Sequence, residues 1–492
     1  MSVSIPFDNS YARLPERFYA SVVPSAASAP RLIKLNRDLA RELGLDPDAL
    51  AGAEGVGILS GLHLAEGSQP IALAYAGHQF AHFVPQLGDG RAILLGEVID
   101  LKGKRRDIHL KGSGRTPFSR GGDGKAALGP VLREYVVSEA MAALGVPTTR
   151  ALAAVATGET VVRDALLPGA AIVRVAASHI RVGTFQFFAA RDDAEGLRLL
   201  ADHVIARHYP DAAAAPQRYR ALLDGIVAAQ ADLVARWLLI GFIHGVMNTD
   251  NMAVSGETID YGPCAFLDDY DPAKVFSSID RMGRYAYGRQ PEMALWNLTR
   301  LAETLLPLLA DDEEAAIAEA QEALAGFAPA FEDAYLGGLR RKLGFATEQE
   351  SDLALATNIL QALAIAKVDF TNFFRGLADA QAPGDGEDRL RAMFDDPSSF
   401  DIWLVTWRAR LAAESQGPGA RREAMRAVNP AFIPRNHRIE AMIRAAVDDD
   451  NFGPFDELNA VLSRPYDDQP DLARYSEPPA EAERVTATFC GT

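Results

Sequence analysis

Cysteine is scarce in this sequence, which holds only Cys264 and Cys490 among its 492 residues. Two cysteines are too few for a disulfide scaffold, and too few for a structural zinc site built from thiolates. With 48% hydrophobic and 23% charged residues, the composition is that of an ordinary globular protein. We therefore expect the chain to fold around apolar cores, and its length predicts two large lobes rather than one.

Long apolar runs are missing as well. No stretch of the sequence has the roughly 20 consecutive apolar residues that a membrane-spanning helix needs. The first residues, MSVSIPFDNSYARLPERF, carry Arg, Asp and Glu early and contain no apolar segment typical of a secretion signal. We therefore expect a cytoplasmic protein that does not contact membranes.

Positive charge is in short supply. The chain has 49 Lys and Arg against 66 Asp and Glu, which gives a formal net charge of −17. Broad binding to nucleic acids or anionic membranes depends on clustered Lys and Arg, so we expect neither partner. A nucleotide remains possible as a ligand, because its phosphates need only a few local cations.

What the sequence does contain changes in character along the chain. Between Ile71 and Phe188, strand-like runs alternate with glycine-rich turns. The clearest runs are AILLGEVI (92–99), DIHLKG (107–112) and AAIVRVAA (170–177). A helix is predicted over 129–145, because Pro130 stands in its first turn and Gly145 just past its end.

Beyond residue 195, apolar residues recur at helical spacing. A long buried helix is predicted over 217–243, and further helices over 286–460. The segment NMAVSGETIDYGP (251–263) predicts two short strands around a Ser-Gly turn. The segment 464–484, rich in Pro and acidic residues, predicts a loose tail.

This order of elements predicts an α+β, protein-kinase-like fold with two lobes, a sheet-rich N-lobe and a helical C-lobe. The expected parts are an N-terminal extension (1–70), the N-lobe with Gly-rich nucleotide-binding segments (71–190), the C-lobe (191–463) and a C-terminal tail (464–492). The C-lobe would carry a catalytic loop at 244–251 and the motif Asp-Tyr-Gly at 260–262.

The segment HGVMNTDN (244–251) follows the spacing of a kinase catalytic loop but lacks its base. His244 precedes Asn251 by the same interval as the His and the magnesium-binding Asn of kinases. The position two residues after the histidine, where kinases have the Asp that accepts a proton, is Val246. The metal-binding end of the loop is therefore present without the usual base.

Asn251 and Asp260 are the expected metal ligands. Asp260-Tyr261-Gly262 is a close variant of the kinase motif Asp-Phe-Gly. Mg²⁺ takes oxygen ligands, usually only one or two of them from protein. Turn-flanking polar residues are the alternative, but the loop, the preceding helix and the motif together favour the metal site.

Lys111 and Glu134 form a second candidate pair. Lys111 ends a predicted strand, and Glu134 shares a helix face with apolar residues, so its carboxylate needs a buried cation. This matches the Lys–Glu pair that positions phosphates in kinases. A solvated strand face for Lys111 and a helix-dipole contact for Glu134 are the alternatives.

Glycine-rich and basic segments complete the candidate site. The turn LGDGR (87–91) is compatible with close approach of a phosphate, although such a turn is more often only a hairpin. The run KGSGRTPFSRGGDGKAALGP (111–130) combines glycines with Arg115, Arg120 and Lys125 ahead of a helix N-terminus, which suits a polyphosphate. Arg174 and Arg181 follow as candidate phosphate clamps.

Four segments together closely resemble the selenoprotein O family, called YdiU in bacteria. They are GHQFAHFVPQLGDGRA, LKGSGRTPFSRGGDGKAALGPVLREYVVSEAM, HGVMNTDN and DYGPCAFLD, and the resemblance covers nearly the whole chain. It implies a pseudokinase fold that binds ATP reversed relative to kinases. It also implies transfer of AMP to Ser, Thr or Tyr hydroxyls of proteins, with self-modification and UMP transfer from UTP as further possibilities, and Mg²⁺ or Mn²⁺ as the metal.

The resemblance also implies roles for individual residues. Asp250 matches the proton acceptor, Asn251 and Asp260 the metal ligands, and Glu134 the partner of Lys111. The positions that match nucleotide contacts are Gly88, Gly90, Arg91, Lys111, Asp123, Gly124, Arg174, Arg181 and Asp260. In a reversed nucleotide the α-phosphate lies at the metals, so a base at Val246 has no use and Asp250 takes its place.

Cys490 lies near the C-terminus, where eukaryotic members of this family carry selenocysteine, and Cys264 follows the Asp-Tyr-Gly motif. A regulatory disulfide between them is one reading; a buried Cys264 and an unstructured Cys490 is the other. The sequence thus predicts a monomeric, metal-dependent protein adenylyltransferase. An ordinary kinase that uses Asp250, and an inactive nucleotide-binding or redox scaffold, are the alternatives.

Overall fold

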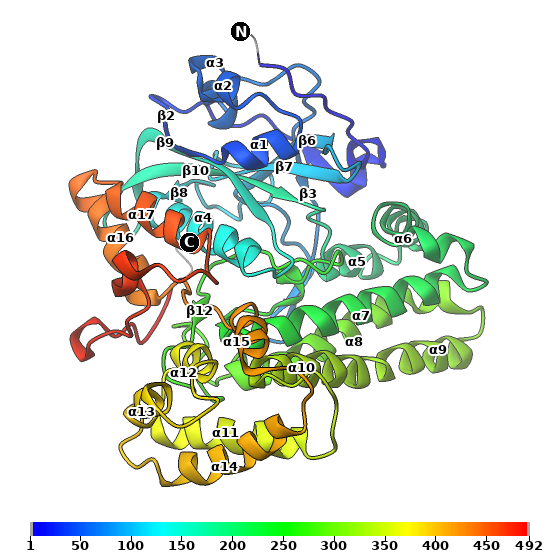
Figure 1. Ribbon diagram of the computed structural model, residues 1–492. Coiled ribbons are helices and arrows are strands. Elements are labelled where there is room, and N and C mark those ends of the chain that lie inside the picture. Colours follow the sequence, from blue (N-terminus) through cyan, green and yellow to red (C-terminus); the bar gives the residue numbers. More distant parts are fainter. Residues whose placement is uncertain (1–2, 490–492) are drawn as a thin grey trace.

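The computed structural model describes residues 3–489 (Figure 1), and the two predicted classes of element occupy different parts of the molecule. A twisted sheet lies near the N-terminus and long helices fill the remainder. The fold is therefore a mixed one, with an antiparallel sheet and many helices, as the sequence predicts. Within residues 3–489, no helix is long and apolar enough to cross a membrane.

The sheet has eight strands and is antiparallel at every pairing of its named strands. Its order is β1 (Tyr19–Ser21), β3 (Ile71–Leu73), β6 (Ala92–Ile99), β7 (Arg105–Lys111), β10 (Leu166–Ala176), β9 (Arg150–Val162) and β2 (Arg31–Leu35), with β8 (Ala126–Ala127) paired to β10. The three predicted strands are confirmed as β6, β7 and β10. Strands from the first 70 residues, β1 and β2, form the two edges.

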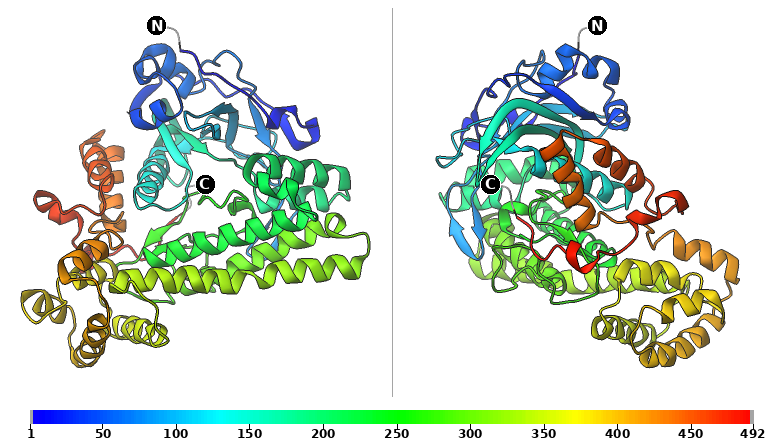
Figure 2. Two further views of the ribbon diagram at one scale, coloured as in Figure 1. Left: turned by 45° about the vertical axis from the view of Figure 1, so that its right-hand side comes forward. Right: turned by 90° about the vertical axis from the view of Figure 1, so that its left-hand side faces the viewer.

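Helix α4 (Leu128–Ala143) crosses one face of the sheet and contacts β9 and β10. It begins and ends close to the predicted limits, and Gly145 after it has φ +79°, a conformation that other residues rarely adopt. On its other side, α16 (Asn436–Asp449) and α17 (Gly453–Leu462) pack against it (Figure 2). Because both faces are covered, α4 is buried along most of its length, and side chains on it are held in fixed positions.

The opposite face of the sheet is covered by three short helices from the N-terminal part. They are α1 (Arg37–Glu42), α2 (Pro47–Ala51) and α3 (Ala53–Leu59). Their leucines pack with the apolar side chains of β6, β7 and β10 in a core of their own. The central strands are therefore buried on both faces.

The helical part is built around α7 (Arg218–Leu239), the long helix predicted before the catalytic loop. It contacts α8 (Gln290–Leu309), α9 (Glu313–Ala325) and α10 (Phe327–Leu343). Two further helices, α5 (Val182–Ala189) and α6 (Ala194–His208), connect this group to the sheet.

A separate aromatic core holds the outer helices together, at the end of the molecule away from the sheet (Figure 2). Trp403 and Trp407 stack at 5.6 Å between ring centroids, and the Trp407 indole donates to the carbonyl oxygen of Leu343. The helices concerned are α11 (Asp352–Ala366), α12 (Phe370–Leu377), α13 (Asp385–Arg391), α14 (Ser398–Ala412) and α15 (Pro418–Arg426).

Two sequence predictions differ from the structure. The segment 251–263 does not form two strands around its Ser-Gly turn: Ala253 pairs with Arg181, and Thr258 with Thr148. Both partners come from distant parts of the chain, so the local Ser-Gly turn does not decide the pairing. The tail is also more ordered than predicted, because it contains two short 3₁₀ helices, Pro470–Tyr475 and Glu481–Glu483, and Arg484 pairs with Asp269 at 2.5 Å.

Candidate functional site

A cleft of about 730 Å³ lies where the sheet meets the helical part. Its walls come from the segments before β6, the loop between β7 and β8, the strands β7 and β10, the start of α5 and the segment that follows α7. The predicted nucleotide, metal and proton-acceptor positions all line it: Gly88, Gly90, Arg91, Lys111, Asp123, Gly124, Arg174, Arg181, Asp250, Asn251 and Asp260. Sequence positions spread over more than a third of the chain therefore meet around one space.

The two glycine-rich segments form one wall, because they pack directly on each other. A Cβ at Gly88 would lie 2.3 Å from the Phe118 ring, and a Cβ at Gly124 would lie 2.0 Å from the carbonyl oxygen of Gly114. Both glycines also have positive φ, +75° and +67°. Only glycine fits at such contacts, so the wall is backbone at the points where a phosphate could approach.

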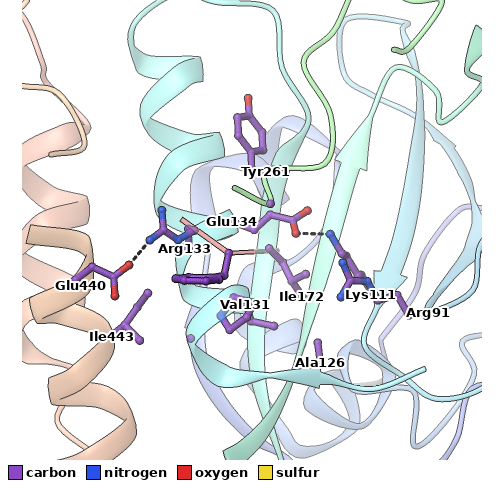
Figure 3. A pocket seen from close by; sticks show the side chains of 14 residues that line it. Arg91, Lys111, Ala126, Val131, Arg133, Glu134, Ile172, Tyr261, Glu440 and Ile443 are labelled. Carbon is purple, nitrogen blue, oxygen red and sulfur yellow. Dashed lines mark hydrogen bonds and ion pairs between the residues drawn. The ribbon is translucent and has the colours of Figure 1, made fainter. Parts of the chain in front are cut away.

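The predicted Lys111–Glu134 pair is present (Figure 3). Lys111, at the end of β7, donates from Nζ to Glu134 Oε2 at 2.6 Å, and Glu134 comes from α4. Both side chains are buried. The pair also borders a smaller pocket of about 210 Å³, between α4 and α16. A buried carboxylate on a rigid helix thus fixes the lysine ammonium group at the cleft.

Three cations converge on Asp260. Arg174 Nη1 lies 2.6 Å from Oδ1 of Asp260, and Lys111 Nζ lies 3.5 Å from the same oxygen. Arg181 Nη2 lies 3.2 Å from Oδ2. Burial alone would raise the pKa of Asp260, but Arg181, Arg174 and Lys111 outweigh it and hold that pKa well below the usual range. Asp260 is therefore ionised at any physiological pH, as a metal ligand must be.

The backbone of Asp260 has φ +58°, in the left-handed region. For a residue other than glycine this conformation costs energy and is common at functional sites. It directs the carboxylate towards the cations of the sheet.

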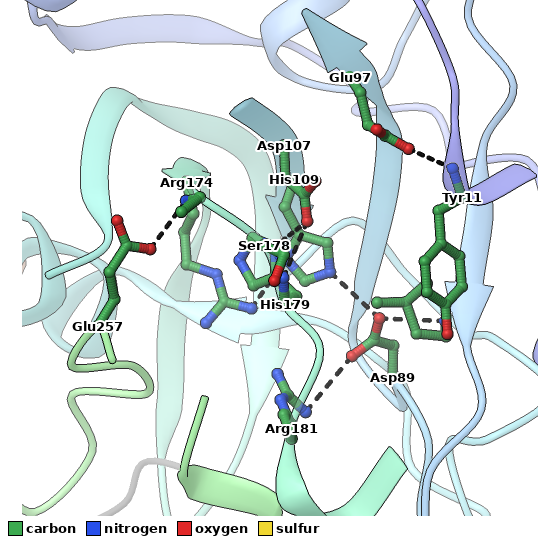
Figure 4. A network of polar contacts seen from close by, with 12 residues as sticks. Tyr11, Asp89, Glu97, Asp107, His109, Arg174, Ser178, His179, Arg181 and Glu257 are labelled. Carbon is green, nitrogen blue, oxygen red and sulfur yellow. Dashed lines mark hydrogen bonds and ion pairs between the residues drawn. The ribbon is translucent and has the colours of Figure 1, made fainter. Parts of the chain in front are cut away.

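Two residues that the sequence did not identify as part of the site, His109 and Asp89, contact the two arginines (Figure 4). Arg174 Nη2 donates to His109 Nδ1 at 2.8 Å, and His109 Nε2 lies 3.2 Å from Asp89 Oδ2. A guanidinium only donates, so Nδ1 must accept and the Nε2–H group must donate to Asp89. Asp89 also faces Arg181 at 3.7 Å. The two arginines therefore share one buried network.

His109 is fully buried and neutral within this network. Burial lowers the pKa of His109, and the Arg174 charge lowers it further. Alternation along β7 places His109 on the same side of the strand as Lys111, a signal that could have identified it from the sequence. Asp89 lies between Gly88 and Gly90 in the turn LGDGR (87–91), but nothing in the sequence indicates that its side chain is buried.

Asp250 lies at the other side of the cleft, in the 3₁₀ turn Thr249–Asn251. It is only 8% exposed, and burial raises the pKa of Asp250 to about 6, against an opposing hydrogen bond from Gln79. Its Oδ1 atom has no hydrogen-bond partner within the described part of the chain. A carboxylate that exchanges a proton near neutral pH and has one oxygen without a hydrogen-bond partner is suited to general-base chemistry.

The side chain of His244 holds the loop 244–251 against the segment that carries Asp260. Its Nε2 atom lies 2.9 Å from the carbonyl oxygen of Ile259, next to Asp260, and the ring is buried. Val246 lines the cleft, and its carbonyl oxygen accepts from Asn251 Nδ2 at 3.0 Å. The loop therefore connects the two predicted metal ligands without placing a base at Val246.

The chemistry of the two predicted ligands fits Mg²⁺ or Mn²⁺. Asn251 and Asp260 line the same cleft and offer an amide oxygen and a carboxylate, the hard oxygen donors that these ions prefer. Within residues 3–489, no group of three or more His, Cys, Asp and Glu side chains could hold a metal ion. Phosphate oxygens and water would have to complete the coordination.

The remaining predicted basic and acidic residues of the glycine-rich run also line the cleft, without contacting Asp250 or Asp260 among the described residues. Arg115, Arg120 and Lys125 line the outer wall of the cleft, and Asp123 is held there by both terminal nitrogens of Arg163, at 2.9 and 3.0 Å. Arg163 follows β9 and has no sequence signal that could have identified it.

Cys264 is buried, at 1% exposure. Cys490 lies outside the described residues, so the predicted disulfide has no structural account.

Comparison with known proteins gives a consistent set of relatives. The family model described as "Protein adenylyltransferase SelO" matches residues 2–463. The chain is 65% identical over 492 residues to a protein of Bradyrhizobium sp. strain BTAi1, and 65% identical over 492 residues to one of Rhodopseudomonas palustris strain BisB5. It is 64% identical over 499 residues to one of Methylorubrum populi. Each alignment covers 100% of both chains, and each relative is named "Protein nucleotidyltransferase YdiU".

Proposed function

The chain belongs to the SelO family of protein adenylyltransferases and is a protein nucleotidyltransferase; on this premise we propose that it transfers AMP from ATP to Ser, Thr or Tyr hydroxyls of proteins. The observation that carries the proposal is the arrangement of charge in the cleft. Lys111 and Arg174 are buried on the sheet strands β7 and β10, and the buried Arg181, just before α5, joins them at Asp260. Asp250 and Asn251 follow α7 on the helical side.

This arrangement supports a reversed nucleotide. The buried cations suit the most highly charged end of ATP, the β- and γ-phosphates. The α-phosphate then lies towards Asp250 and Asn251, and the adenine points outward. A kinase needs the opposite order, with the γ-phosphate beside the residue that accepts the proton of the hydroxyl.

The reaction follows from this placement. The Asp250 carboxylate takes the proton of the substrate hydroxyl, and the hydroxyl oxygen attacks the α-phosphorus. The bond from that phosphorus to the oxygen shared with the β-phosphate breaks, and pyrophosphate leaves with the electron pair. Lys111, Arg174 and Arg181 stabilise the negative charge that develops on the pyrophosphate.

Asn251 and Asp260 would hold Mg²⁺ or Mn²⁺, which neutralises phosphate charge when bound. Glu134 has a supporting role, because it keeps Lys111 in position. The glycine-rich wall around Gly88 and Gly124 would pack against the nucleotide through backbone groups.

We further propose a protein-kinase-like division of the chain into an N-terminal extension (1–70), an N-lobe (71–190), a C-lobe (191–463) and a tail (464–492). The sheet with its single crossing helix, followed by α7 and the loop at 244–251, supports the N-lobe and the C-lobe. The extension adds the edge strands β1 and β2 to the sheet of the N-lobe. A cytoplasmic monomer, UTP as a second substrate, and a regulatory disulfide between Cys264 and Cys490 belong to the same proposal.

Labelled ATP tests the proposed function. Incubation with Mn²⁺ or Mg²⁺ and ATP labelled at the α-phosphate should label protein, including the enzyme itself, whereas γ-label should leave with pyrophosphate. Asp250→Ala should lower the transfer by at least about 100-fold, within the range for loss of a general base. Retention of γ-label on protein would indicate a kinase, and no labelling with either would indicate an inactive scaffold.

A further inference from the structure

A short hairpin, formed by β4 (Gly77–Gln79) and β5 (His82–Val84), packs against the turn that carries Asp250. Its tip residues, Phe80 and Ala81, both have positive φ, +50° and +67°. Non-glycine residues hold this conformation only where surrounding contacts maintain it. The contacts in question are with the loop that carries Asp250.

Two backbone hydrogen bonds attach the hairpin to this loop. The amide of His78 donates to Thr249 Oγ1 at 2.7 Å, and the amide of Phe80 donates to Asn248 Oδ1 at 3.0 Å. Both side-chain acceptors are held by other parts of the protein. Thr249 Oγ1 donates to Gln186 at 2.6 Å, and Asn248 Oδ1 also accepts from the Tyr285 hydroxyl at 2.7 Å. The hairpin is thus anchored on each side of Gln79.

Gln79 itself reaches Asp250. Its Nε2 atom donates to Asp250 Oδ2 at 3.1 Å, and Gln79 lines the cleft. An ionised carboxylate can only accept, so the amide nitrogen of Gln79 must face it. The anchoring bonds of His78 and Phe80 fix the backbone from which this side chain extends.

The two oxygens of Asp250 consequently differ. Oδ2 is engaged by Gln79, whereas Oδ1 is buried and has no partner among the described residues. Gly77 packs closely on this oxygen, since a Cβ there would lie 2.8 Å from it. A buried acceptor without a donor costs free energy, unless a ligand supplies the donor.

We propose that Gln79 is a positioning residue for nucleotidyl transfer: its hydrogen bond to Oδ2 holds the Asp250 carboxylate in the orientation in which it accepts the proton of the incoming hydroxyl. The inference rests on the proposed function, because it takes Asp250 as the proton acceptor. Gln79 acts through Asp250 and does not contact the phosphates in this role.

Two substitutions separate positioning from a general structural effect. Gln79→Leu keeps much of the volume and removes the donor. Gln79→Glu keeps the shape and places a second carboxylate against Asp250. A merely structural role would tolerate Glu, the closer match in shape, better than Leu. A positioning role should give the opposite order of activities, because Leu only removes the hydrogen bond whereas Glu also sets two carboxylates against each other.

The matched control is His82→Ala. His82 pairs with Gln79 across the hairpin, is exposed, and does not line the cleft. Its substitution perturbs the same hairpin without touching the loop, so transfer should remain within about two-fold of the wild-type rate, as for surface changes away from special contacts.

The experiment measures kcat and the KM for ATP, with α-labelled ATP, Mn²⁺ and a protein acceptor, for wild type and the three variants. We expect Gln79→Leu to lower kcat by about 10- to 100-fold, the usual effect of losing a group that orients a catalytic side chain, with KM for ATP within about two-fold. Gln79→Glu should be slower still.

The inference is overturned if Gln79→Leu keeps the wild-type kcat, if its affinity for ATP falls as much as kcat, or if the Glu variant is the more active of the two. A wild-type protein that transfers no α-label would instead overturn the proposed function, and this inference with it. The two failures are therefore distinguishable from the wild-type reaction alone.

Discussion

At the scale of single residues, two aspartates in one cleft lie in different electrostatic environments, as their proposed roles require. Asp260 is surrounded by Lys111, Arg174 and Arg181 and stays ionised. Asp250 is buried, no cation among residues 3–489 is in hydrogen-bond contact with it, and burial raises its pKa to about 6. Environments that push the pKa values of two carboxylates apart are a common way to separate a proton acceptor from a fixed charge.

Lys111 provides a residue-level test of how the nucleotide lies. In the reversed orientation its ammonium group contacts the far phosphates of ATP and not the α-phosphate. Lys111→Met should therefore weaken ATP binding by at least about 10-fold, the value for one hydrogen bond to a charged group, and change AMP binding by less than about two-fold. Calorimetric titration of both nucleotides measures this. An equal loss for AMP and ATP would contradict the orientation.

The residues of the candidate site could be predicted in part. Lys111 and Glu134 follow from strand alternation and helix periodicity, and the structure joins them at 2.6 Å. Gln79 and Arg163 could not be predicted, since each acquires its partner, Asp250 or Asp123, only through contacts between segments far apart in sequence. A polar residue in a short strand or after a hairpin has no local signature of such a contact.

At the scale of elements, the start of α5 is fitted closely against the connection between β3 and β4. A Cβ at Gly183 would lie 2.1 Å from the carbonyl oxygen of Ala76 and 3.5 Å from the Cα atom of Asp250. Both obstacles are backbone atoms, which cannot move aside as the end of a side chain can. The close approach joins the sheet side of the cleft to its helical side.

Gly183→Ala should therefore destabilise the protein by about 2 kcal/mol or more, as expected for added volume in a packed site. Urea unfolding measures the effect. Gly419→Ala is the control: Gly419 lies in the first turn of α15, and a Cβ there would meet nothing within 4 Å. This change should be neutral or stabilising by up to about 1 kcal/mol, because alanine favours helix. Equal unfolding midpoints for the two variants would contradict the argument.

Periodic elements could be predicted and irregular ones could not. β6 has the predicted limits, Ala92–Ile99, and α4 begins within a residue of its predicted start, because alternating or helical spacing of apolar residues is a local property. The prediction of two strands in segment 251–263 was wrong, because its pairing partners, Thr148 and Arg181, lie more than 70 residues away in the sequence. Its conformation is set by tertiary contacts.

At the scale of the whole molecule, one buried histidine makes the free energy of unfolding depend on pH. His437, on α16, is 4% exposed, and neither ring nitrogen has a partner among the described residues. Burial, together with Arg438 and Arg435, lowers the pKa of His437 to about 4 from an ordinary value of 6.5. Below pH 6.5 the unfolded chain binds a proton there that the folded protein does not, so folding stability falls as pH decreases.

His437→Leu should remove this contribution. Between pH 7 and pH 5 the variant should lose about 2 kcal/mol less stability than the wild type, which corresponds to one histidine kept neutral by folding. Urea unfolding of both proteins at the two pH values gives the difference directly. An identical pH dependence in the two proteins would show that His437 is protonated in the folded state.

The central claim at this scale is that the cleft holds ATP with its phosphates towards the sheet. The most direct measurement is a crystal structure with Mg²⁺ and an ATP analogue that has a methylene group between the α- and β-phosphates. We expect the γ-phosphate beside Lys111, Arg174 and Arg181, and the α-phosphorus nearest Asp250. Adenine on the sheet side, with the γ-phosphate beside Asp250, would contradict it.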